Sequence, residues 1–164
     1  MPMDYTVIQA VRQRFGASDL GGPPGEAAVF GNAPFVGRSK EFHFDCPSVS
    51  PDDMAVLQFT SVGIDVDDRA GRSPSTLRIN GVDVAGGLHV GPASERYPLW
   101  TTQLLLVPQV TLAEHRNVLF IEAAHAPAFI NEYVDSFVID NVVIFYKTRV
   151  SDRTHGGPPN VVLG

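Results

Sequence analysis

Three acidic side chains stand close together in the stretch IDVDDRAGRS. Asp65, Asp67 and Asp68 follow a long apolar run, at the expected end of a strand. Closely spaced carboxylates suit a hard cation such as Ca²⁺, which takes many oxygen ligands. The run departs from the EF-hand pattern, because Arg69 replaces the third ligand. A solvated acidic turn is therefore the simpler interpretation, and a calcium site is the alternative.

A second candidate for metal chemistry is the pair His43 and Asp45 in EFHFDC. A His-x-Asp pair with a distant histidine is the ligand set of non-haem Fe(II) oxygenases, which also use a jelly-roll barrel. The third ligand would be another histidine of the chain: His89, His115 or His125. Phe42, Phe44 and Cys46 alternate with the pair and are expected to face the core. His43 and Asp45 should then point to solvent, which argues against an iron site.

Two further stretches carry side chains of the kind that bind carbohydrates, aromatic rings for stacking and planar polar groups for hydroxyls. They are Arg96 and Tyr97 in GPASERYPLW, and Asn131, Glu132 and Tyr133 in AFINEYVDS. Both stretches are expected at strand ends. Aromatic residues make up only 9% of the chain and most fall in expected strands, so ordinary loop residues are the simpler interpretation.

Catalytic motifs give no support for an enzyme. The sequence holds no Gly-x-Ser-x-Gly motif, and no glycine-rich turn joins a strand to a helix for phosphate binding. We therefore expect a protein that is not an enzyme and that needs no cofactor, with calcium as the one exception left open.

The composition indicates one domain with a real core. The chain has 164 residues, of which 44% are hydrophobic. Its net charge of −6 argues against a nucleic-acid partner, which needs a basic face. Cys46 is the single cysteine, so no intrachain disulfide is expected. The first residues do not form a signal peptide and no long apolar run occurs, so we expect a protein without membrane insertion that is cytoplasmic or part of a released particle.

The elements that must position these residues are strands. Asn80 and Gly81 lie between two β-rich flanks, as a two-residue type I′ hairpin requires. No convincing long helix separates the strands, so residues 39–150 are expected to form an all-β, antiparallel sandwich. The candidate strands lie in EFHFDC, MAVLQFTSVGIDV, STLRINGVDV, LWTTQLLLVP, RNVLFIEAAHA and DSFVIDNVVIFYKTRV.

The order of these stretches resembles the galactose-binding-like jelly roll over residues 40–148. The matching pieces are LQFTSVGIDV, LRINGVDV, LWTTQLLLVPQVTL, RNVLFIEAA and DSFVIDNVVIFY. The resemblance implies that Trp100 packs under the sheet and that Asn117 shapes the turn into its strand. Arg116 stands where the family usually has glycine. Members of this family are ligand-binding or assembly modules more often than enzymes, and the fold does not fix a ligand.

Residues 1–38 are expected to form an extended N-terminal arm, and residues 151–164 a short C-terminal tail. The spacing of Val7, Ile8, Val11 and Phe15 predicts a short helix over residues 5–15. The rest of the arm is rich in glycine and proline. Its spaced apolar residues are expected to fill pockets of a partner: Leu20, Val29, Phe30, Phe35 and Val36. Their burial alone does not offset the entropy of ordering the arm, so backbone hydrogen bonds such as strand addition to a sheet edge are needed.

These features favour a non-catalytic structural or adhesion component of a larger homo-oligomeric assembly, such as a virion, a tail-like particle or a surface lattice. The arm would tie subunits together, so the expected partners are copies of the chain or other assembly subunits. The alternative is a soluble carbohydrate-binding module with a structural calcium, whose partners would be glycans.

Overall fold

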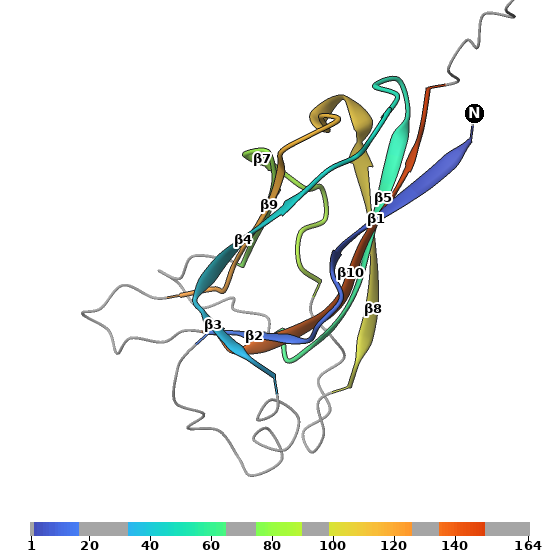
Figure 1. Cartoon of the computed structure of the whole chain (residues 1–164). Coiled ribbons are helices and arrows are strands. Elements are labelled where there is room, and N and C mark those ends of the chain that lie inside the picture. Colours follow the sequence, from blue (N-terminus) through green and yellow to red (C-terminus); the bar gives the residue numbers. More distant parts are fainter. Residues whose placement is uncertain (1, 17–32, 65–74, 90–98, 126–134, 150–164) are drawn as a thin grey trace, which may run out of the picture.

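The computed structural model describes residues 2–16, 33–64, 75–89, 99–125 and 135–149, and within them it is an all-β sandwich. Two sheets pack against each other with the core between them (Figure 1). Sheet A consists of β1 (Met3–Gln9), β2 (Gln13–Phe15), β3 (Phe35–Gly37), β5 (Met54–Val62), β8 (Thr101–Pro108) and β10 (Phe137–Lys147). Sheet B consists of β4 (Ser39–Phe44), β6 (Thr76–Ile79), β7 (Val82–Asp83) and β9 (Asn117–Glu122). The expected fold class is confirmed.

Strand β10 organises sheet A. The order of the sheet is β3-β2-β10-β5-β8, and β1 pairs with β10 beyond the end of β2. Sheet B has the order β4-β9-β6-β7. All strand pairs are antiparallel except β2 and β3, which run parallel.

The alternation expected for EFHFDC is confirmed. Phe42, Phe44 and Cys46 are buried in the core between the sheets. His43 and Asp45 point outward and are exposed. Alternate residues of β5 are buried in the same core, because successive side chains of a strand point to opposite faces.

Hydrogen bonds connect the Asn80–Gly81 turn to Asn117 at the start of β9. Both turn residues have positive φ, 51° and 81°, as the type I′ hairpin requires. The Asn80 side-chain amide donates to Asn117 Oδ1 over 2.9 Å. Asn117 is fully buried, and its side chain accepts from the Ala113 N–H and donates to the Ala113 carbonyl, each over 2.7 Å. The prediction that Asn117 shapes the turn into its strand is confirmed.

The predicted helix over residues 5–15 is wrong, because this segment forms β1 and β2. Both strands pair with β10, with Tyr5 opposite Phe145 and Phe15 opposite Phe137. The apolar spacing fitted a helix as well as strands, and the open edge of β10 decided between them by offering backbone hydrogen bonds. Phe15 is fully buried and its ring stacks on Phe137 at 5.2 Å.

The described part of the arm thus belongs to the sandwich. Strands β1, β2 and β3 are members of sheet A, although all three precede residue 39. Strand addition is the kind of ordering that the arm was expected to need, and here the edge that accepts it is in the same chain.

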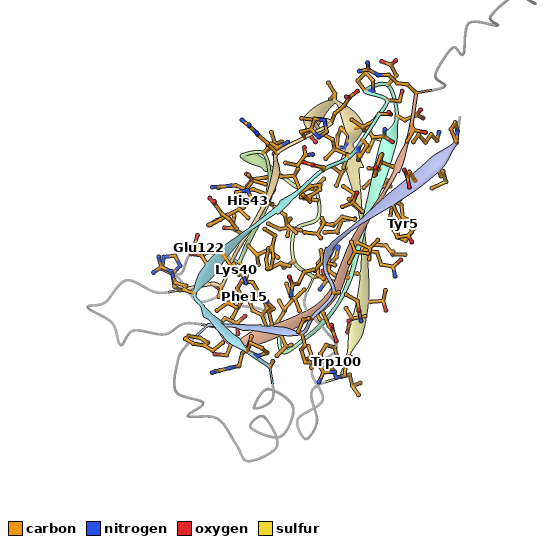
Figure 2. All side chains as sticks on the ribbon, viewed as in Figure 1. Tyr5, Phe15, Lys40, His43, Trp100 and Glu122 are labelled. Carbon is orange, nitrogen blue, oxygen red and sulfur yellow. The ribbon has the colours of Figure 1, made fainter. Side chains whose placement is uncertain are left out.

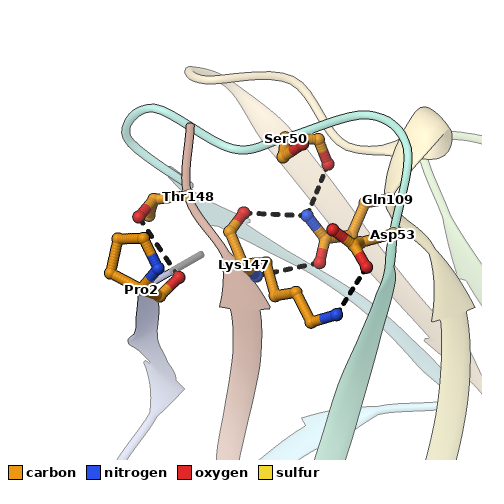
Figure 3. Close-up of polar contacts among 6 residues, drawn as sticks. All are labelled: Pro2, Ser50, Asp53, Gln109, Lys147 and Thr148. Atoms are coloured by element: carbon orange, nitrogen blue, oxygen red, sulfur yellow. Dashed lines mark hydrogen bonds and ion pairs between the residues drawn. The ribbon is translucent and has the colours of Figure 1, made fainter. Parts of the chain in front are cut away.

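A buried glutamine joins the end of β10 to the neighbouring loops (Figure 3). The Gln109 side chain is fully buried and donates to the carbonyls of Ser50 and Lys147, over 2.5 Å and 2.9 Å. Its Oε1 accepts from the Lys147 N–H over 2.8 Å. Without this amide, the Ser50 carbonyl and the Lys147 N–H would lose the hydrogen bond described here, whereas the Lys147 carbonyl would keep the one that it accepts from the Ser50 N–H over 2.9 Å.

We predict that Gln109→Leu lowers the free energy of unfolding by about 3 kcal/mol, because buried backbone groups would lose their hydrogen bonds. Chemical denaturation with an unchanged m-value measures the loss. Val110→Ala, at a neighbouring side chain that is 72% exposed, should change the same quantity by less than about 0.5 kcal/mol. Equal effects of the two substitutions would contradict the role given to Gln109.

Candidate functional site

The outer face of sheet A, the face turned away from sheet B, carries a set of apolar side chains that is interrupted on β5 by Gln58. Strand register places them in adjacent rows on four neighbouring strands. Four of them are half to two-thirds exposed: Tyr5 60%, Val7 50%, Leu104 62% and Leu106 58%. The apolar face, as we name it, consists of Met3, Tyr5, Val7, Met54, Val56, Leu104, Leu106, Val143 and Phe145.

Strand β8 contributes two leucines to this face because a polar residue occupies its inner side. Gln103 is only 2% exposed. Its amide donates to Ser61 Oγ over 2.7 Å and to the His89 carbonyl over 2.8 Å, and its oxygen accepts from the His89 N–H. These bonds fix which side of β8 faces inward, and so Leu104 and Leu106 face outward.

Strand β1 also turns apolar side chains to the outer face and a polar side chain to the inner face. Tyr5 lies opposite Phe145, and their ring centroids are 6.1 Å apart. On the other side of the strand, the Thr6 hydroxyl donates to the Asp45 carbonyl over 2.6 Å. The apolar side chains of β1 therefore extend the outer face of β10. Figure 2 shows Tyr5 on the side of sheet A that faces away from sheet B.

The outer face of sheet B is different, because its side chains are mostly charged or polar. Arg78 pairs with Asp83 at 2.6 Å, and Arg38 pairs with Glu122 at 3.2 Å. His43 and Glu122 lie on this opposite side of the molecule (Figure 2). An alternation of apolar inner and polar outer residues is the usual pattern for a sheet with one face in water.

Charged groups bound the apolar face at both ends, and each has a partner within the chain. At one end Lys147 Nζ lies 2.5 Å from Asp53 Oδ1. At the other end Arg12 Nε lies 3.4 Å from Asp140 Oδ2, and its guanidinium lies 4.8 Å from the centroid of the Trp100 ring.

Trp100 does not pack under the sheet, and this expectation is wrong. Its side chain is 41% exposed. Trp100 precedes β8 and falls on the same side as Leu104, an even number of residues away. Once Gln103 is turned inward, the tryptophan faces out, where Arg12 covers its ring.

A hollow of about 580 Å³ on sheet B is lined by His43, Phe44, Asp45, Arg116 and Val118. Asp45 Oδ1 accepts from the Arg116 N–H over 2.7 Å, and His115 Nδ1 lies 3.3 Å from Asp45 Oδ2. The Arg116 hydrogen bond and then His115 hold the pKa of Asp45 below its ordinary value. Among the described residues, no group of three or more His, Cys, Asp or Glu side chains could hold a metal. The arrangement shapes a turn and offers no complete ligand set there.

Most of the sequence-predicted site residues lie outside the described residues. This holds for the three aspartates of the calcium candidate, for both carbohydrate stretches and for three arm residues: Asp65, Asp67, Asp68, Arg96, Tyr97, Asn131, Glu132, Tyr133, Leu20, Val29 and Phe30. Phe35 is 43% exposed, and the Arg14 guanidinium lies 4.6 Å from its ring centroid. Val36 is half-buried against the chain's own core. The assembly role of these two residues stays a prediction.

Comparison of the chain with protein-family models, curated proteins and solved structures finds no match. In the described part of the chain, no helix has the length and apolar character needed to cross a membrane. A function must therefore be inferred from the two outer faces of the sandwich themselves.

We predict that Asp45→Asn lowers the unfolding temperature at neutral pH and that this difference shrinks in acid. The folded-state pKa of Asp45 lies below the ordinary value of 3.8. At pH values between these two pKa values, the unfolded state therefore binds more protons than the folded state does. The stabilisation by the carboxylate is thus present above 3.8 and is lost as the pH falls through the lowered pKa. Thermal unfolding of both proteins across this range measures it. A difference that does not depend on pH would contradict the assignment.

Arg116 has a φ of 61°, a region that costs most side chains about 1–2 kcal/mol and costs glycine almost nothing. We predict that Arg116→Gly raises the free energy of unfolding by about 0.5–1 kcal/mol, after the added flexibility of the unfolded glycine is subtracted. Arg116→Ala is the matched control and should bring no gain, because alanine keeps the Cβ. Denaturant unfolding of the three proteins decides, and a gain with alanine would refute the backbone explanation.

Proposed function

We propose that this chain is a non-catalytic structural or adhesion component of a larger homo-oligomeric assembly, such as a virion, a tail-like particle or a surface lattice. The observation that carries the proposal is the contrast between the two outer faces of one sandwich. Sheet B turns charged side chains to solvent, whereas sheet A turns valine, leucine, methionine and aromatic side chains outward.

The size of the apolar face supports this function. Six of its side chains, each about half exposed or more, present on the order of 600 Å² of apolar area, which equals or exceeds the largest patch of a typical monomer. Patches of this size mark contact sites between macromolecules. The side chains of the face spread over four neighbouring strands, and the one hollow described above lies on sheet B. A broad sheet face of this kind suits a macromolecular surface better than a small ligand, which binds in a concave site.

In this assembly the main contact between subunits lies on the apolar face of sheet A and not on the N-terminal arm. Residues 3–15 are held by β10 of their own chain, so this part of the arm is already paired. Phe35, whose ring lies against the buried Arg14 guanidinium, remains an exposed contact candidate at the edge of sheet A. The arm then supports assembly by completing the sheet that carries the apolar face.

The sandwich is compatible with the galactose-binding-like jelly roll that the sequence resembles. We propose that the chain is a member of this family. Two stacked sheets and the Asn80–Gly81 hairpin support it. The soluble carbohydrate-binding module with a structural calcium remains the alternative. Its predicted residues lie outside the described residues, and no observation in the structure favours it over assembly.

The test of the proposal is the mass of the protein in solution. We predict that the unmodified chain forms a multi-subunit species by light scattering at micromolar concentration. The double variant Leu104→Glu/Leu106→Glu should weaken association by at least 100-fold, about 3 kcal/mol, because its carboxylates would be buried in the contact.

The matched control carries two new acids on the other face. Ser39→Glu/His43→Glu changes two exposed positions of β4 and gives the same change of net charge. It should leave the mass unchanged. The unfolding temperature of both variants, measured at a concentration where each is monomeric, shows that the fold is kept. An unmodified chain that stays monomeric at every concentration would refute the assembly function.

A further inference from the structure

We propose that the outer face of sheet A packs on the same face of a second copy, around a two-fold axis that lies parallel to the sheets and runs across the strands. The inference rests on the proposed function and adds to it the partner surface, the symmetry and the register. A two-fold contact uses one patch twice, so the patch must complement itself after rotation. The described apolar face meets this condition.

Strand register divides the centre of the face into two rows. The first row contains Tyr5, Phe145, Val56 and Leu106. The second row contains Val7, Val143, Gln58 and Leu104. Each row crosses β1, β10, β5 and β8 in that order, and the side chains of both rows point outward.

An axis between these two rows exchanges them. Rotation by 180° lays each strand antiparallel over its own copy. Leu104 then lies over Leu106 of the second copy, and Tyr5 lies over Val7 of the second copy. In these two rows the apolar side chains of β1, β10 and β8 meet apolar side chains, as in the inner faces of aligned β-sandwiches. On β5, Val56 lies over Gln58 of the second copy.

The charged residues at the two ends of the face, Lys147 and Asp140, are also placed favourably by this axis. Lys147 pairs opposite Met3, one row beyond the first, and Asp140 pairs opposite Thr60, one row beyond the second. Rotation therefore brings Lys147 over Asp140 of the second copy. Both keep their partners within the chain, Asp53 and Arg12, so the contact buries no unpaired charge.

The competing two-fold axis runs along the strands, and charge disfavours it. That axis brings the two copies of Lys147 to one end of the contact and the two copies of Asp140 to the other. Like charges set opposite each other act against a complex, whereas opposite charges fix its register. The axis across the strands is therefore the arrangement that the face supports.

The area of the face is of the order that a stable pair needs. Stable interfaces bury roughly 800 Å² on each partner, and the apolar face with the residues at its two ends approaches that value. A partner of different chemistry would have to present an uncharged, apolar surface of similar width. In the described part of the chain, the outer face of sheet A is such a surface, and a second copy supplies it.

Disulfide formation between two single-cysteine variants tests the register. The variants are Leu104→Cys and Leu106→Cys, both at exposed positions, so the core is left intact. Cys46 is the one native cysteine, and its burial raises the pKa of its thiol to about 12, so it does not compete. Under mild oxidation, an equal mixture of the two should form a covalent dimer at least ten-fold faster than either variant alone. The control mixture pairs Leu106→Cys with Arg78→Cys, on the opposite face, and should remain uncrosslinked.

Each outcome separates the inference from the proposed function. A covalent dimer that depends on mixing supports the axis across the strands. If the unmodified chain forms oligomers but the mixture reacts no faster than its components, the register is wrong while the assembly function stands. If the unmodified chain is monomeric at every concentration, the assembly function fails, and the inference fails with it.

Discussion

Strand β10 is apolar on both of its faces, and this constraint governs the rest of the structure. Val142, Ile144 and Tyr146 point into the core between the sheets, while Val143 and Phe145 point the other way. Such two-sided strands normally lie in sheets that are covered on both sides. A two-layer sandwich covers one side only. The neighbours β1, β5 and β8 add apolar side chains to the uncovered side, so the apolar face extends over four of the six strands of sheet A.

The same strand explains the arm. An isolated glycine- and proline-rich leader cannot offset its ordering entropy with a few apolar side chains. β10 has a second edge, and β1 and β2 pair with successive halves of it. Their backbone hydrogen bonds stabilise residues 3–9 and 13–15, the part of the arm that comes before its glycine- and proline-rich stretch, and Phe15 anchors this part in the core. The described part of the arm is thus a part of sheet A, and the surface that this sheet leaves for a partner is a face of side chains.

Much of the sandwich could be predicted from local pattern, and the face could not. The alternation around Phe42 and Phe44 and the Asn80–Gly81 turn are local signals, and both appear as expected. Helix and strand fitted residues 5–15 equally well, because the deciding partner, β10, lies over a hundred residues away in the sequence. For β8 the local sequence pattern does not predict which side of the strand faces the core. Leu104 and Leu105 are equally apolar, and the hydrogen bonds of Gln103 with Ser61 and His89 decide which of them is buried.

The apolar face cannot be removed by any local rearrangement. A slip of β8 by one residue would turn Leu104 and Leu106 inward, but it would turn Leu105 and Val107 outward in their place. The same slip of β10 would exchange one apolar set for another. Both strands therefore leave apolar side chains outside in either register. Because no change of register can hide these side chains, their burial requires a surface that the described sandwich does not itself contain. A second copy of the face provides such a surface, with the same two rows and with its charges in the opposite order.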